Sequence, residues 1–166
     1  QGVWNDSNSP AWSSDYHMNV NLQMNYWPTY STNMAECAPP LIEYIDSLRE
    51  PGRLSAAAYT GVESTEENPE NGYTIHVISN PFGWSAPGWG VDWGWAPGCT
   101  PWILQNVWDY YDYTRDVDYL RETIYPMMKE QAKFWQQYLV YNEDTGRMEE
   151  IPSISSEQPF VSEGAT

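Results

Sequence analysis

The sequence has 166 residues, enough for one domain with a core, and a formal net charge of −16 from seven Lys and Arg against 23 Asp and Glu. A field of this sign repels phosphate backbones and anionic lipid, which argues against nucleic acid and membrane surfaces as partners. No apolar run approaches the roughly 20 residues that span a bilayer, so membrane insertion is not expected.

The N-terminal part of the chain predicts a loop followed by short helical turns. Residues 1–16 are rich in Ser, Asn and Pro and are typical of a loop. Residues 18–34 predict a helical turn or two, broken at Pro28 because proline lacks a backbone N–H and clashes with the preceding turn.

Two further helices are predicted next. Proline suits the first turn of a helix, so we expect one to begin near Pro39, and its apolar residues recur at helical spacing up to residue 48. We expect this helix to end at residues 50–52, Glu-Pro-Gly. A shorter helix is predicted over 53–61, closed by Gly61.

The middle of the chain predicts a strand between two loops. Residues 63–72 are acidic and Asn-rich, which favours a solvated loop, and YTIHVIS at 73–79 is the best strand candidate. Residues 80–98 contain several Pro and Gly but also four Trp. We therefore expect a long ordered loop there and not a flexible linker.

The remaining chain predicts two helices and a turn. An amphipathic helix begins at Pro101, and a second helix begins with Asp116 as N-cap and continues to Leu139, with a kink or break at Pro126. The stretch NEDTG predicts a turn, and an extended segment follows. Paired helices around a core are the expected architecture, with a site built by loops at one end.

Aromatic residues make up 16% of the sequence, with ten Trp and thirteen Tyr but only three Phe. Rings that carry a polar group favour half-wet surfaces, and a sugar offers a matching surface of apolar C–H faces and hydroxyls. The same composition fits a Trp-rich core, because aromatic residues dominate cores as well as sites. Composition therefore leaves both interpretations open.

The stretch DYHMNVNLQMNYWP, residues 15–28, sets several amides among apolar side chains. If the chain is extended here, His17, Asn19 and Asn21 point to one side and can together orient a hydroxyl or a water. An amide cannot accept a proton at neutral pH, so a carboxylate must serve as base. In the alternative interpretation the amides cap the neighbouring helix or tie loops together.

Glu157 is a second candidate. It lies in a Ser-rich, Pro-bounded stretch, PSISSEQP, with apolar residues on either side. Apolar surroundings favour the protonated carboxyl, as a general acid requires at neutral pH. A solvated surface carboxylate is the alternative, since the chain contains many acidic residues.

No metal site or cofactor is expected. The two histidines are far apart in the sequence, and no Cys or His cluster has ligand spacing. A phosphate-binding glycine loop is also missing from the sequence. Cys37 and Cys99 can pair or stay free, and the sequence does not decide between these states.

Five stretches occur in order along the chain: QGVWND, WSSDYHMNVNLQMNYWP, WGWAPGCTPWILQNVWDYYDYTRDVDYL, IYPMMKEQAKFW and PSISSEQP. Together they resemble the catalytic domain of glycoside hydrolase family 95, the inverting α-L-fucosidases with some α-L-galactosidases. The resemblance implies a mainly α fold with long Trp-rich loops and short strands, part of a single (α/α)6 barrel. By this resemblance residues 1–166 would form about its first half, and the remainder of the same polypeptide would complete it. The chain also begins without Met, so we expect it to be a segment of a longer protein.

The resemblance also implies residue roles. Glu157 matches the general acid, Asn19 and Asn21 match the amide pair that holds the attacking water, and the base is an aspartate beyond residue 166. His17 matches the histidine of fucosidase members at a position where galactosidase-like members tend to have Thr, which favours fucose. No cofactor is needed for this chemistry.

Further sugar contacts are expected from His17 and from Trp93 or Trp95, which would cover the apolar face of the sugar. His76 and Asn80 are also candidate substrate-binding residues, although HVISNPFGW replaces a His-His and Asp-containing motif that many family members carry.

The expected substrate is a fucosylated oligosaccharide or glycoprotein glycan, and the expected location is extracellular, periplasmic or at the cell surface. An α-L-galactosidase, a non-catalytic carbohydrate-binding module and a helical scaffolding domain are the alternatives.

Overall fold

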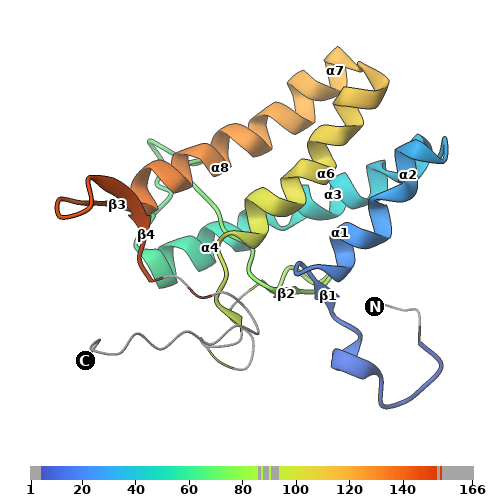
Figure 1. Cartoon of the computed structure of the whole chain (residues 1–166), viewed down its shortest axis with the longest axis horizontal. Helices are drawn as coiled ribbons and strands as arrows, with labels where there is room; N and C mark the ends of the chain where they lie inside the picture. The colour runs from blue at the N-terminus through green and yellow to red at the C-terminus, as the bar shows by residue number, and fades with distance from the viewer. Residues whose placement is uncertain (1–4, 86, 88–89, 91–93, 153, 155–166) are drawn as a thin grey trace.

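The structure, a computed structural model, describes residues 5–85, 87, 90, 94–152 and 154 (Figure 1). Within these residues the chain is mainly helical, and its short strands form two two-stranded sheets. The mainly α fold class predicted from the sequence is confirmed.

The N-terminal part contains more regular structure than the predicted loop. A 3-10 turn, η1 (Ala11–Ser14), precedes the strand β1 (Tyr16–His17). β1 pairs antiparallel with β2 (Ile78–Ser79), with Tyr16 opposite Ser79 and His17 opposite Ile78. Two residues near the start of the chain are therefore joined to a segment more than 60 residues away.

The short helices follow as predicted. α1 (Asn21–Tyr26) ends before Pro28, and α2 (Pro28–Ser31) takes this proline as its first residue, where a missing N–H costs nothing. A 3-10 turn, η2 (Ala35–Cys37), leads into the next helix.

The helix end expected at residues 50–52 is wrong. α3 (Pro39–Ser47) ends at Leu48, and α4 (Arg49–Thr60) begins at once, so that Pro51 lies in its first turn. The N–H groups of a first helical turn have no helical partner, and proline therefore does not interrupt α4. Gly61 ends this helix in the left-handed conformation, with φ of 73°, as predicted.

Gly52 lies where α4 meets the segment 73–77. A Cβ at this position would lie 3.1 Å from the Thr74 carbonyl oxygen and 3.3 Å from Tyr73 Cβ. The Thr74 N–H donates to the Gly52 carbonyl over 3.1 Å. The missing side chain therefore allows the two backbones to come into direct contact.

The strand predicted over 73–79 forms only at its last two residues, as β2. The rest is a buried segment whose backbone bonds to several different elements. The Thr100 hydroxyl accepts from the Ile75 N–H at 2.7 Å and lies 2.8 Å from the Ile75 carbonyl oxygen, and the Val77 carbonyl accepts from Met18 N–H at 2.7 Å. These partners satisfy the polar backbone of an apolar segment that passes between helices.

The second half contains the longest helices. α6 (Cys99–Thr114) begins two residues before the predicted start, and α7 (Val117–Tyr119) is capped by the Asp116 side chain, which accepts from Tyr119 N–H at 2.9 Å as predicted. A π-helical turn, η3 (Leu120–Ile124), then leads into α8 (Tyr125–Tyr138). The chain remains helical through Pro126, so the expected interruption takes the form of this wider turn.

A β-hairpin follows α8, where the sequence predicted helix up to Leu139. Strand β3 (Leu139–Asn142) pairs with β4 (Arg147–Glu150), with Leu139 opposite Glu150 and Asn142 opposite Arg147. The predicted turn is confirmed, and the extended segment after it is confirmed over Arg147–Glu150, but the partner strand was not predicted. Figure 1 shows α6 and α8 side by side, joined at one end through α7, with the hairpin at the other end of α8.

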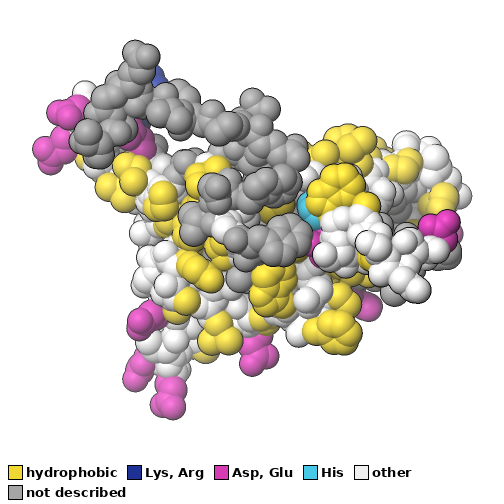
Figure 2. All heavy atoms as spheres, turned by 90° about the horizontal axis from the view of Figure 1, so that it is seen from below, with side chains coloured by type: hydrophobic (Ala, Val, Ile, Leu, Met, Phe, Trp, Pro, Cys, Tyr) yellow, Lys and Arg dark blue, Asp and Glu magenta, His cyan; other side chains and the backbone are white. Residues whose placement is uncertain are grey.

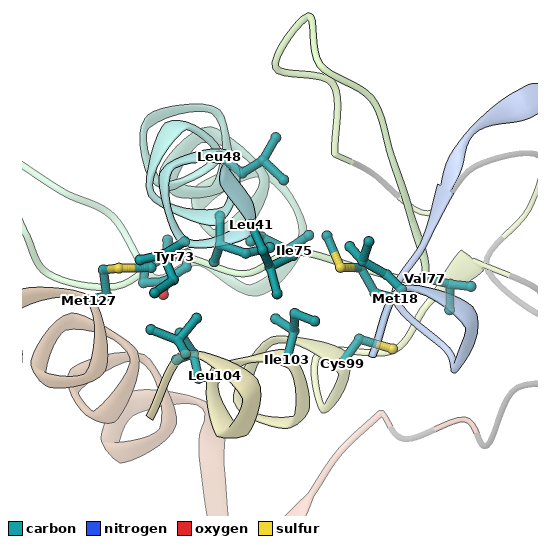
Figure 3. Close-up of a cluster of buried hydrophobic side chains, with 14 of the residues drawn as sticks. Met18, Leu41, Leu48, Tyr73, Ile75, Val77, Cys99, Ile103, Leu104 and Met127 are labelled. Atoms are coloured by element: carbon teal, nitrogen blue, oxygen red, sulfur yellow. The ribbon is translucent and has the colours of Figure 1, made fainter. Parts of the chain in front are cut away.

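The main core lies between α3, α6, α8 and the segment 73–78. Figure 3 shows Tyr73 and Ile75 between Leu41 on α3 and Ile103 on α6. A second cluster joins α4, α8 and the residues before α6, and it contains Ala56, Val62, Trp95, Phe134 and Tyr138.

A buried ion-pair network joins α4 to α8. The side chain of Glu130 is 1% exposed and contacts two arginines, with Oε2 2.7 Å from Arg49 Nη2 and Oε1 2.6 Å from Arg53 Nε. Glu70 also lies 3.0 Å from Arg49 Nη2. Removing one partner of a buried pair costs about 3–5 kcal/mol, because the remaining charges stay buried without compensation.

We therefore expect Glu130→Gln to loosen the contact between α4 and α8. In the full-length polypeptide, amide hydrogen exchange measured by mass spectrometry should become roughly a hundredfold faster in peptides from both helices, since about 3 kcal/mol is two powers of ten. The exposed Glu122→Gln in η3 is the matched control and should leave exchange unchanged. Equal protection in the two variants would contradict a stabilising role for the network.

Candidate active site

His17 is held in a buried position by β1. Its Nδ1 lies 2.5 Å from Asp15 Oδ1, and the two side chains are only 8% and 10% exposed. The edge of the Trp12 ring lies against the imidazole, with ring centroids 6.3 Å apart. Burial raises the pKa of Asp15 above its ordinary value, and the neighbouring His17 offsets this only in part.

The second imidazole nitrogen of His17 faces the interior of the protein. Nε2 is buried and has no hydrogen-bond partner among the residues that the structure describes. A buried polar atom of this kind carries a desolvation cost unless something pairs with it. A ligand hydroxyl is one group that can do so.

The extended conformation expected from His17 to Asn21 is wrong beyond His17. The chain turns after Met18, and α1 begins at Asn21, so the three side chains do not line one strand. His17 is buried, Asn19 is half-buried and Asn21 is exposed.

The amides that tie this region together are ones the sequence analysis did not single out. Gln23 is fully buried, and its Nε2 donates to the Met18 carbonyl at 2.5 Å. Asn106 Nδ2 on α6 in turn donates to the Gln23 carbonyl at 3.2 Å. The burial of Gln23 could have been predicted from its position in α1, because it lies next to Leu22 on the buried side of this helix. Asn19 and Asn21 are not part of this network.

Asn19 instead borders a cavity of about 170 Å³. The cavity lies where the turn before α1, the start of α6 and the end of β4 meet. Its lining consists of polar, aromatic and small residues from these segments: Asn19, Ala96, Gly98, Cys99, Trp102, Glu150 and Ile154.

Trp95 belongs to the buried aromatic cluster, as its 3% exposure shows. Its ring lies 4.9 Å from that of His76 and 6.4 Å from that of Tyr138, centroid to centroid. Trp95 Nε1 and the Tyr138 hydroxyl both donate to the Pro152 carbonyl, at 3.2 and 2.6 Å. In this structure Trp95 therefore anchors the chain segment that leads toward Glu157.

His76 is fully buried beside Trp95. Its Nδ1 accepts from Ala96 N–H at 3.1 Å, and burial lowers the pKa of the imidazole to about 4. It is therefore neutral near pH 7. Within the described part of the chain its Nε2 has no hydrogen-bond partner.

Asn80 shapes the turn after β2. Its Oδ1 accepts from Phe82 N–H at 3.0 Å and from Trp84 N–H at 3.2 Å. The amide oxygen is thus used to hold the backbone of this turn. Phe82 and Trp84 are exposed, at 92% and 41%.

Two of the predicted site residues, Glu157 and Trp93, lie outside the described residues. The approach of Glu157 to Asn19 and Asn21 therefore stays a prediction. Figure 2 shows one face of the molecule. Hydrophobic side chains are spread over this face, with a small exposed area of histidine among them, and the acidic side chains lie mostly toward the margin.

The described residues include two free thiols and no cluster of metal-ligating side chains. Among them, no group of three or more His, Cys, Asp or Glu can hold a metal ion. Cys37 is exposed and Cys99 is buried, and both are free; burial, together with the nearby Glu150, raises the pKa of the Cys99 thiol to about 12. In the same residues no helix has the length and apolarity needed to cross a membrane.

Comparisons with known proteins agree on one family. The family described as "Glycosyl hydrolase family 95 catalytic domain" matches residues 1–166. The chain is 38% identical over 145 residues to "Probable alpha-fucosidase A" of Aspergillus niger and 32% identical over 162 residues to "Alpha-L-fucosidase 2" of Arabidopsis thaliana. These matches cover 86% and 97% of the chain but only 17% and 18% of the relatives. The chain thus spans less than a fifth of the length of the curated relatives that it matches.

The burial of His76 generates a pH prediction. Unfolded histidine titrates near pH 6.5, so between about pH 6.5 and 4 the unfolded state binds the extra proton and the stability contributed by neutral His76 falls as the pH decreases. Imidazole C2 hydrogen exchange, followed by mass spectrometry against pH, should give an apparent pKa below 5 for His76. A value near 6.5 would contradict the buried position.

Proposed function

The chain belongs to glycosyl hydrolase family 95, and we propose on that basis that the polypeptide containing it removes terminal α-L-fucosyl residues from glycans. The family match over residues 1–166 carries the proposal. The names of the relatives support fucose as the sugar, since both of those compared are called fucosidases. We also propose that the helices described above are part of an (α/α)6 barrel completed by the rest of the polypeptide.

The proposed reaction proceeds with inversion and uses two carboxyl groups. Glu157 protonates the glycosidic oxygen as the bond to the anomeric carbon breaks and the aglycone leaves. A water attacks the anomeric carbon from the opposite face, held by Asn19 and Asn21, and an aspartate from beyond residue 166 accepts its proton. The two carboxyl groups of an inverting glycosidase lie roughly 6.5–9.5 Å apart to leave room for this water.

Three features of the described residues support this mechanism. Asn19 borders a cavity, so its amide can reach a bound molecule. The Pro152 carbonyl is held by two donors, which restrains the chain five residues before Glu157. His17 presents a buried Nε2 that has no partner among the described residues, and a sugar hydroxyl can pair with it, as expected for a substrate contact.

The fucosidase assignment is tested by hydrolysis of α-L-fucosides by the full-length polypeptide, with NMR detection of the first anomer formed. The β-anomer is expected from inversion. Fucose carries a methyl group where L-galactose carries a hydroxymethyl group, and matched α-L-galactosides should be poorer substrates. A preference for the galactosides would instead make the protein an α-L-galactosidase, and binding of fucosides without hydrolysis would indicate a binding module. A location outside the cytoplasm, where such glycans occur, is part of the proposal.

Replacement of the proposed acid should depend on the leaving group. Glu157→Gln should lower the turnover of a glycan substrate by roughly 10²–10⁴-fold or more, because the leaving oxygen then departs without a proton. An aryl fucoside with an acidic phenol needs less protonation and should lose much less. Glu143→Gln, an exposed change in the β3–β4 turn, is the control. Equal losses on both substrates would argue against the acid role.

The amides allow a second test within one helix. Asn21 is exposed at the first position of α1, so Asn21→Ala should change thermal stability little. Because the proposed mechanism uses its amide to hold the water, the same change should slow hydrolysis at least tenfold. Gln23→Ala removes a buried donor and should lower stability instead. If Asn21→Ala unfolds the protein as Gln23→Ala does, its role is structural.

A further inference from the structure

Three distant segments meet around the cavity that Asn19 borders. The turn before α1 contributes Asn19, the first turn of α6 contributes Trp102, and the last residue of β4 contributes Glu150. At about 170 Å³ the cavity lies below the roughly 300 Å³ at which pockets for drug-sized ligands begin, so it suits one small ring.

The lining groups define the chemistry of the ligand. A carboxylate at Glu150 accepts hydrogen bonds, the amide of Asn19 both donates and accepts, and the half-buried Trp102 offers a ring. The cavity opens at the N-terminus of α6, a position that favours anions in general. The carboxylate of Glu150 and the net charge of −16 oppose an anion here, and the positive end of the α6 dipole opposes a cation, which leaves a neutral molecule with several hydroxyls and a C–H face.

Strand geometry places Glu150 differently from its neighbour. Successive side chains of a strand point to opposite faces. Glu149 accepts from Asn142 Nδ2 at 2.8 Å and from the Thr145 hydroxyl at 2.7 Å, and so holds the hairpin turn. Glu150, the next residue, borders the cavity.

We propose that this cavity binds the fucosyl ring, with Glu150 accepting hydrogen bonds from its hydroxyls and Trp102 lying against its C–H face. The inference rests on the proposed function, and it adds two residues to the proposed sugar contacts. Because Asn19 would hold the water on the face opposite the leaving group, a ring beside Asn19 is the fucosyl unit and not the aglycone. Substitutions that line the cavity should therefore have the same effect on fucosides with different aglycones, and free L-fucose should bind.

Gly98 provides a way to fill the cavity without strain. Its backbone has φ of −60° and ψ of −17°, which any residue can adopt, and a Cβ there would meet none of the described residues within 4 Å. Gly98→Leu should therefore leave the fold intact and place a side chain in the cavity. We expect KM for an aryl α-L-fucoside and the inhibition constant of L-fucose to rise together, at least tenfold.

Glu150→Gln tests the hydrogen bond itself. The full-length wild type and this variant are assayed on an α-L-fucoside and on its 2-, 3- and 4-deoxy analogues, with Glu143→Gln as a matched charge control. If Glu150 binds a hydroxyl, one deoxy analogue should lose at least fivefold less kcat/KM in the variant than in the wild type. The control should show the wild-type pattern. A residue that only supports the hairpin lowers activity on all four substrates equally.

The outcomes separate this inference from the proposed function. Two results would overturn the fucosyl cavity alone, provided that the wild type hydrolyses fucosides. In the first, the effects of all three deoxy substitutions are additive with Glu150→Gln. In the second, Gly98→Leu leaves KM and the inhibition by L-fucose unchanged. A wild type that neither hydrolyses fucosides nor binds L-fucose overturns the proposed function, and the cavity assignment with it. Should Glu150→Gln fail to fold, the Gly98→Leu measurements decide.

Discussion

One buried carboxylate fixes the relation of the two halves of the chain. Glu130 on α8 contacts Arg49 and Arg53 on α4, so two of the seven cations in a chain of net charge −16 meet on a single acid. α4 in turn contacts the segment 73–77 through Gly52, and α8 continues directly into the β3–β4 hairpin. The ion-pair network therefore contributes, together with the two hydrogen bonds to the Pro152 carbonyl, to where the end of β4 lies relative to the core.

Local signals in the sequence predicted the helices well and their breaks less well. Apolar spacing found α3, α6 and α8, and the side-chain cap at Asp116 and the left-handed Gly61 were confirmed because each acts within one helical turn. The helix end predicted near Pro51 was wrong because proline interrupts a helix when it lies in the helix interior, whereas Pro51 lies in the first turn of α4. Leu48 gives no signal that a new helix starts beside it. The first strand of the hairpin was not predicted, because its four residues follow α8 directly and no Pro or Gly marks the end of the helix.

The candidate site was predictable only in part, because its geometry depends on contacts between distant segments. The resemblance identified His17 and Asn19, and the structure places the first in a buried pair with Asp15 and the second at a cavity. Nothing local to Glu150 distinguishes it from other acids in the hairpin. Both interpretations of the Trp-rich composition apply: Trp95 is part of the core, whereas Trp102 borders the cavity. Glu157 and Trp93 lie outside the residues described.

The Pro152 carbonyl, which accepts two hydrogen bonds, limits where the length of this hairpin can vary among relatives. Trp95 and Tyr138, from two different parts of the chain, donate hydrogen bonds to this same oxygen, and Pro152 is two residues beyond the end of β4. Inserted residues at the hairpin tip, 143–146, would bulge into solvent without moving that oxygen. A single residue gained or lost between Arg147 and Pro152 would shift the strand register and swap Glu149 with Glu150. We therefore expect natural length variation to accumulate at the tip and to be rare along β4.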